Sequence, residues 1–189
     1  MNLIYSSAIG EIKTITNSYQ TISCEGCKIN TRFESEQEKE LLVLDYQLSH
    51  KNWVWRQLHK VFERVFKISV DFGWVQINKK LDYVDWRDYG VISIFIKGSG
   101  KPSGIDFSIT EEDGDAWYYF DKESLTSEDW VEIRMPFEDF VNPKWASHGN
   151  GKKEFKNVTQ IAVTITNFDR PIENTLYFET FDGDLFKLA

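Results

Sequence analysis

Five carboxylates lie close together in the middle of the chain, and pairs of carboxylates can carry out glycoside hydrolysis. They are Glu111, Glu112, Asp113, Asp115 and Asp121. The first four fall in the run EEDGD, which is typical of a tight turn between two strands. In such a turn Asp and Gly serve backbone geometry and solubility. We therefore predict no catalytic residue, and we do not expect the chain to be an enzyme.

Aromatic side chains offer a different chemistry, because they make up 15% of the chain. The apolar faces of sugar rings stack on Trp and Tyr, which combine a broad rigid ring with a polar tip. Period-two alternation places Trp74 and Gln76 on one face of their run, and it places Trp117 and Tyr119 on one face of another. These faces mix aromatic and polar groups, as a saccharide platform would. The alternative is that Trp74 and Trp117 are core residues.

Trp145 has a different setting, because it lies in the polar run NPKWASHGNG. A Trp in a solvated loop has little core to join. We predict that Trp145 contacts a ligand.

The two cysteines form the sequence Cys24-Glu25-Gly26-Cys27. No second pair completes a four-cysteine zinc site, and the three histidines are scattered. The βαβ pattern of a thioredoxin-like site is also missing. We expect free thiols.

Short runs of alternating apolar and polar residues dominate the chain, as in an antiparallel β-sandwich. The expected core residues are Ile92, Ile94, Ile96, Phe107, Ile109, Val131, Ile133, Ile161 and Val163. Strands are expected at 41–48, 67–72, 74–81, 91–97, 105–109, 117–121, 130–135, 160–166 and 176–180. Residues 98–104 are expected to form a hairpin loop, and 142–153 a long polar loop. We expect residues 1–189 to form one domain.

Residues 52–66 break this pattern, because their apolar residues recur at helical spacing. We expect one short inserted helix there. It would cap one open end of the sandwich or, alternatively, bind a partner.

Charge and hydropathy limit the partners. The formal net charge of −8 and the lack of a Lys/Arg cluster argue against nucleic acid. No apolar run approaches the length of a membrane span, about 20 residues. The N-terminus lacks the pattern of a signal peptide. The protein would be cytoplasmic if this is the whole chain, and extracellular if it is one domain of a secreted enzyme.

Several runs, taken in order, resemble carbohydrate-binding module family 11 and its relatives with a galactose-binding-like fold. They include WVQINKKL from Trp74, DWRDYG from Asp85, IFIKG from Ile94 and WVEIRMPF from Trp130. The series is also similar to the complex I intermediate-associated protein family. The resemblance covers roughly residues 41–185.

Membership of family 11 would imply a jelly-roll sandwich with a concave aromatic and polar face that binds β-glucan chains without cleaving them. It would also imply a structural calcium ion, for which Glu179 is a candidate ligand. Asp113 and Trp145 match cleft positions of the family, and Trp74 matches one loosely. The expected cleft tyrosine of the penultimate strand is replaced by Ile165.

These observations predict a non-catalytic domain that binds a carbohydrate polymer, and the catalytic module of a longer enzyme is a second candidate partner. The predicted ligand-binding residues are Trp74, Gln76, Asp113, Trp117, Tyr119 and Trp145. The alternative function is a protein-interaction or assembly domain of the complex I intermediate-associated type, which would use the segment at 52–66.

Overall fold

The protein is described by a computed structural model that covers residues 9–14, 19–36, 39–49, 73–101, 104–121, 127–144, 146–167, 172–180 and 184–189. The strands and the one short 3-10 helix of this part of the chain are β1 (Ile9–Thr14), β2 (Tyr19–Cys24), β3 (Lys28–Glu36), β4 (Lys39–Leu48), β5 (Gly73–Val84), β6 (Val91–Lys97), β7 (Gly104–Glu111), β8 (Ala116–Asp121), β9 (Trp130–Pro136), η2 (Phe137–Asp139), β10 (Val158–Asn167), β11 (Ile172–Glu179) and β12 (Lys187–Leu188).

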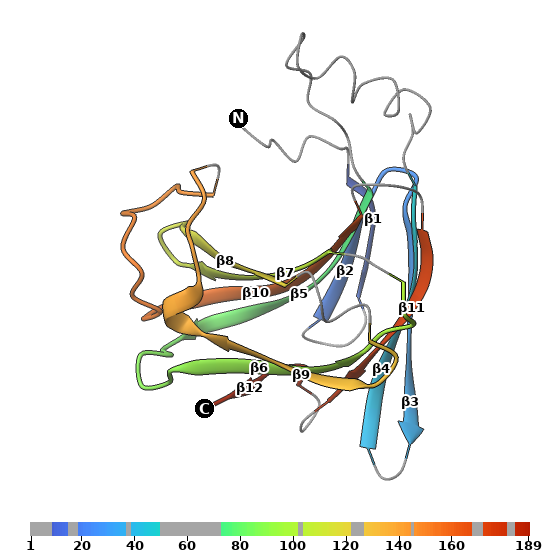
Figure 1. Ribbon diagram of the computed structural model, residues 1–189. Coiled ribbons are helices and arrows are strands. Elements are labelled where there is room, and N and C mark those ends of the chain that lie inside the picture. Colours follow the sequence, from blue (N-terminus) through green and yellow to red (C-terminus); the bar gives the residue numbers. More distant parts are fainter. Residues whose placement is uncertain are drawn as a thin grey trace, which may run out of the picture.

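The strands form two antiparallel sheets packed face to face (Figure 1). The first sheet has the order β1-β2-β5-β10-β7-β8. In the second sheet, β9 pairs with one edge of β6, β11 and β12 share its other edge, and β4 and β3 follow β11. The fold is therefore the predicted antiparallel β-sandwich of jelly-roll type.

The core lies between the two sheets and follows the alternation of the strands. All nine predicted core residues pack there, eight of them buried and Val131 half-buried against the others. In β4 the predicted apolar face is also confirmed, since Leu42, Leu44, Tyr46 and Leu48 are all in the core.

Aromatic side chains fill the core beside η2. Phe137 has its ring centroid 4.6 Å from that of Phe155, and Trp86 stacks on Phe137 at 6.3 Å. Trp117 meets Phe155 edge-on at 6.5 Å. Phe140 contacts both Phe137 and Phe155, each at 6.2 Å. This cluster anchors η2 and the start of the following loop to the start of β8.

Two sequence expectations about connections are wrong. Residues 98–104 do not form a hairpin, because β6 lies in the second sheet and β7 in the first, so the segment crosses between sheets. Cys24 and Cys27 are not free thiols but form a disulfide across the turn between β2 and β3. The turn at Asp113-Gly114 does join the paired strands β7 and β8, with Gly114 at φ +91°.

The helix expected at 52–66 and the strand expected at 67–72 lie outside the described residues. Within the described part, η2 is the only helical element, and no helix is long and apolar enough to span a membrane. That residues 1–189 form a single domain stays a prediction.

Candidate functional site

The outer face of the first sheet carries two rows of side chains that cross five strands. Residues paired in adjacent antiparallel strands share a face, so the strand register defines these rows. One row runs Gln20–Asn78–Ala162–Ser108–Tyr118, and the other runs Ile22–Gln76–Thr164–Asp106–Phe120. Figure 1 shows that this sheet is curved, and the loop that follows η2 rises beside β8.

An aromatic pair ends the two rows on β8. The rings of Tyr118 and Phe120 are stacked, with centroids 5.9 Å apart and planes at 15°. Phe120 is 47% exposed, so much of its ring is open to solvent or to a ligand. Burial, followed by the charge of Asp106, raises the pKa of Tyr118 to about 12, so its hydroxyl keeps its proton at neutral pH.

Polar side chains occupy the middle of the same face. Asn78, Thr164, Asp106 and Ser108 are all less than 10% exposed, which shows that the centre of the face is shielded from solvent. Gln76 is half-buried, and its Nε2 donates to Oγ1 of Thr164 at 2.9 Å. Of these five side chains, Gln76 is therefore the one that remains partly open to a ligand, on the same face as the exposed ring of Phe120.

The loop at 141–151 extends this face beyond β8. The backbone N–H of Tyr118 donates to the carbonyl of Val141 at 2.7 Å, and the N–H of Val141 donates back at 2.9 Å. The buried carboxylate of Asp115 accepts the N–H groups of His148 and Gly149, each at 3.0 Å. These bonds, that of Gly149 foremost, lower the pKa of Asp115. Charge-assisted hydrogen bonds to Asp115 thus attach the loop to the turn between β7 and β8.

Lys153 holds the other end of that loop. Its ammonium donates to the carbonyls of Phe137, Glu138 and Phe140 at 2.8–2.9 Å and lies 5.6 Å from the centroid of the Trp117 ring. The carbonyls of a helical turn's last residues otherwise lack partners. Lys153 therefore joins η2, the loop and the aromatic core.

Residues 59–170 match a known protein family, described as "Carbohydrate binding domain (family 11)". This match covers more than half of the chain. The chain belongs to this family.

Solved structures with the same fold include two of the family 11 module from Clostridium thermocellum. One, in complex with a β-1,3-1,4-mixed-linked tetrasaccharide, has a TM-score of 0.61 and 18% identity, covering 96% of this chain and 94% of that one. The other, from cellulosomal cellulase Lic26A-Cel5E, has a TM-score of 0.59 and 17% identity, covering 97% and 96%.

An exo-β-agarase matches over 93% of this chain but only 24% of its own, with a TM-score of 0.53 and 8% identity. A search of curated proteins finds no match. The similarity to the complex I intermediate-associated family gains no support from these comparisons.

In this family 11 domain, two of the predicted ligand-binding residues lie on the face described above. Gln76 is in the middle of its row, and Trp74 lies on the same face one step further along β5. Trp74 is only 9% exposed and packs with the hydrophobic core, as the alternative had it, so little of its ring is open to a ligand. Phe120 and Tyr118, which sequence reasoning assigned to the opposite face, supply the accessible aromatic surface instead.

Trp117 and Tyr119 lie on the opposite face of the first sheet from Gln76, and their role as ligand-binding residues stays a prediction. Their partners in β7 are Ile109 and Phe107, which are core residues. Trp117 is 7% exposed and donates from Nε1 to Glu111 at 2.6 Å. Both aromatics point into the sandwich and pack with the core on the inner face of the first sheet.

The remaining predicted positions have different outcomes. Asp113 is exposed in the β7–β8 turn, where its carboxylate accepts the N–H groups of Asp115 and Asn150. Its role toward a ligand stays a prediction. Trp145 lies outside the described residues. Ile165 is a core residue, so its side chain does not reach the outer face.

The role of Glu179 as a calcium ligand stays a prediction. Its carboxylate pairs with the Lys39 ammonium at 2.8 Å, and no group of three or more His, Cys, Asp or Glu side chains that could hold a metal occurs among the described residues. Structural calcium elsewhere in the chain stays a prediction, and a melting curve with and without EDTA tests it.

Proposed function

We propose that the outer face of the first sheet binds a β-glucan-like polysaccharide and does not cleave it. The observation that carries this proposal is the exposed ring of Phe120, stacked on the half-buried Tyr118 at the end of two polar rows. An aromatic ring packs against the apolar face of a pyranose while neighbouring amides, hydroxyls and carboxylates bond its hydroxyl groups. The tetrasaccharide held by the Clostridium thermocellum module supports a β-linked glucan as the ligand class.

The geometry of the rows indicates how such a chain would lie. From Gln76 on β5 to Phe120 on β8 the row crosses three strand intervals. At a strand spacing of about 4.8 Å this spans roughly 14 Å, the length of roughly three pyranose rings. A glucan lying across the strands would therefore contact the half-buried Gln76 and the exposed ring of Phe120 together.

The same rows support binding without hydrolysis. Glycosidases use two carboxyl groups on either side of the scissile bond, and their separation sets the stereochemical outcome. Asp106 is the only carboxylate in the two described rows. A single carboxylate can accept hydrogen bonds from sugar hydroxyls but lacks the second group that the reaction requires.

We also propose that the domain serves a catalytic module in a longer protein. The agarase match supports this proposal, because there the same sandwich makes up only about a quarter of an enzyme. The domain would hold the polysaccharide close to the catalytic site and so raise its effective concentration.

The test is affinity electrophoresis in gels that contain soluble mixed-linked β-glucan, xylan or mannan. We expect β-glucan to retard the wild-type chain and Phe120→Ala to lose about 1–3 kcal/mol of binding, by analogy with stacking on other aromatic platforms. Phe33 is the matched control, because it is 43% exposed on β3 of the other sheet. Phe33→Ala should bind like wild type. Equal retardation of all three chains would reject the proposed face, and sugar release would reject the non-catalytic function.

A further inference from the structure

The outer face of the second sheet holds a groove of about 970 Å³ on the opposite side of the sandwich from the face described above. Its floor is formed by β3, β4 and β11, and Ser99 and Lys101 line it from the segment after β6. Its volume is in the range of ligand sites, about 300–1,000 Å³. A space of this size can accept more than one sugar ring.

The floor of this groove is a grid of polar side chains. The strand register places six lining residues in two rows of three: Lys28–Gln47–Glu173 and Asn30–Asp45–Thr175. Adjacent strands are about 4.8 Å apart, so neighbouring groups in a row can reach neighbouring hydroxyls of one small ligand. Alternation along the three strands explains why every second side chain is polar here.

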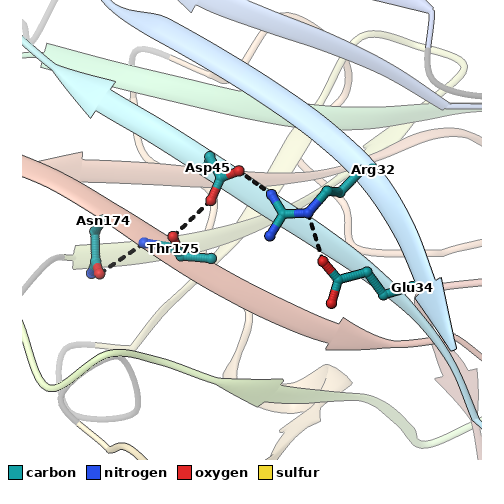
Figure 2. Close-up of polar contacts among 5 residues, drawn as sticks. All are labelled: Arg32, Glu34, Asp45, Asn174 and Thr175. Carbon is teal, nitrogen blue, oxygen red and sulfur yellow. Dashed lines mark hydrogen bonds and ion pairs between the residues drawn. The ribbon is translucent and has the colours of Figure 1, made fainter. Parts of the chain in front are cut away.

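Part of the grid is fixed by internal bonds, as Figure 2 shows. Asp45 accepts from the hydroxyl of Thr175 at 2.7 Å and also binds the guanidinium of Arg32. Arg32 donates as well to Glu34 at 2.6 Å, so its guanidinium bridges two carboxylates. These contacts hold the middle of the floor in one arrangement.

The other part of the grid is open to a ligand. Within the described residues, no hydrogen bond or ion pair involves the side chains of Lys28, Asn30 or Gln47, and all three are exposed. Lys28 and Gln47 face each other across β3 and β4, and Asn30 lies two residues further along β3. An ammonium and two amides thus present both donors and acceptors above a rigid base.

The chemistry of the lining selects a neutral, hydroxyl-rich ligand. Two cations, Lys28 and Lys101, are balanced by two anions, Asp45 and Glu173, so the groove has no net charge with which to attract an ion. The single aromatic residue in the lining, Tyr46, is buried in the core. A ligand here would be held by hydrogen bonds rather than by stacking.

We infer that this groove is a second carbohydrate contact, which binds a short saccharide or the end of a chain. This second contact goes beyond the proposed function, because the groove lies on the other sheet and shares no residue with the face that carries Tyr118 and Phe120. A domain with contacts on opposite faces holds two polysaccharide chains, or two segments of one chain, and gains avidity on a polymer that it does not gain on a short oligosaccharide.

The experiment is an NMR titration of the full chain with the mixed-linked β-glucan tetrasaccharide and, separately, with cellotetraose. We expect two groups of shifted amides, one around Tyr118 and Phe120 and one around Lys28, Asn30 and Gln47. In Phe120→Ala the first group should shift much less and the second should remain. In Asn30→Ala/Gln47→Ala the second group should disappear while the first remains.

Glu132→Ala is the control, because this exposed residue is on the outer side of β9, at the far edge of the same sheet. It should titrate like wild type. If the amides of the groove do not move with either oligosaccharide, the second contact is refuted. If they move only when Phe120 is intact, it is refuted as well. Shifts limited to the groove would instead reject the proposed function and leave the second contact standing.

Discussion

Replacing Trp117 by Phe tests whether this residue stabilises the fold or binds the ligand. Trp117 lies on β8 next to the proposed binding residues in sequence, but its side chain points into the core. The substitution keeps a ring in place and removes the N–H that donates to Oε2 of Glu111 at 2.6 Å. Because both side chains are less than 10% exposed, water cannot easily replace the lost donor.

The size of the effect follows from these contacts. A buried hydrogen bond to a charged group contributes about 1.5–3 kcal/mol, and a stranded acceptor costs a similar amount. The smaller ring also gives up contacts with Phe155 and with the Lys153 ammonium. We expect Trp117→Phe to lower the free energy of unfolding by about 2–4 kcal/mol at pH 7, with the packing loss included.

The loss should depend on pH. Burial raises the pKa of Glu111 above its ordinary 4.5, and the Trp117 N–H is the foremost of the bonds that lower it. A carboxyl with a raised pKa binds more protons in the folded state, so stability falls as pH rises from 4.5 through the folded pKa. Removing the N–H raises that pKa further. The variant should therefore lose more stability at pH 7 than at pH 5.

Urea unfolding at both pH values measures the effect, with glucan affinity measured on the same samples. Trp130→Phe is the control, because Trp130 is 38% exposed on β9 and should change stability by less than about 0.5 kcal/mol. An equal loss at pH 5 and pH 7 would refute the role assigned to Glu111. A loss of affinity with unchanged stability would show that Trp117 binds the ligand after all.

Three further predictions concern the loops around the sandwich. Lys153→Met removes three bonds to carbonyls and should lower the free energy of unfolding by about 2–4 kcal/mol in urea, whereas Lys152→Met should not. Replacing Cys24 and Cys27 by Ser opens a very short loop and should cost about 2 kcal/mol, or roughly 4–8 °C in Tm. A wild-type chain that melts unchanged in reductant would contradict this. Trp145→Ala should weaken glucan binding by about 1–3 kcal/mol with an unchanged Tm, and a lower Tm would make Trp145 a packing residue.

The strands and the core could be predicted because alternation is a local property. In β6, Ile92, Ile94 and Ile96 recur at every second position, and the sheet buries all three. The aliphatic residues of β10 mark its inner face in the same way, with Ile161 and Val163 buried. Each of these strands identifies its own core face without reference to any other strand.

Pairing between strands is not local, and the expectations that depended on it failed. The glycine-rich segment at 98–104 has the composition of a hairpin loop, yet it connects strands of different sheets. Nothing in the alternation of β6 or β7 specifies their neighbours, which are β9, β11 and β12 for one and β10 and β8 for the other. The polar grid in the groove of the second sheet could not be predicted for the same reason. Its rows form only when β3, β4 and β11 pair in register.

On the proposed binding face, alternation alone does not determine which side chains of every strand point outward. In β5 one set of residues is aliphatic, so Val75 and Ile77 identify the core and leave Gln76 on the outer face. In β8 both sets are aromatic, and the pattern cannot say whether Trp117 or Phe120 is inside. The register with β7 decides, because Trp117 is opposite the core residue Ile109, whereas Phe120 is opposite the polar Asp106. A strand with aromatics on both faces therefore needs its neighbour's pattern, and reading β7 and β8 together would have placed Tyr118 and Phe120 on the binding face.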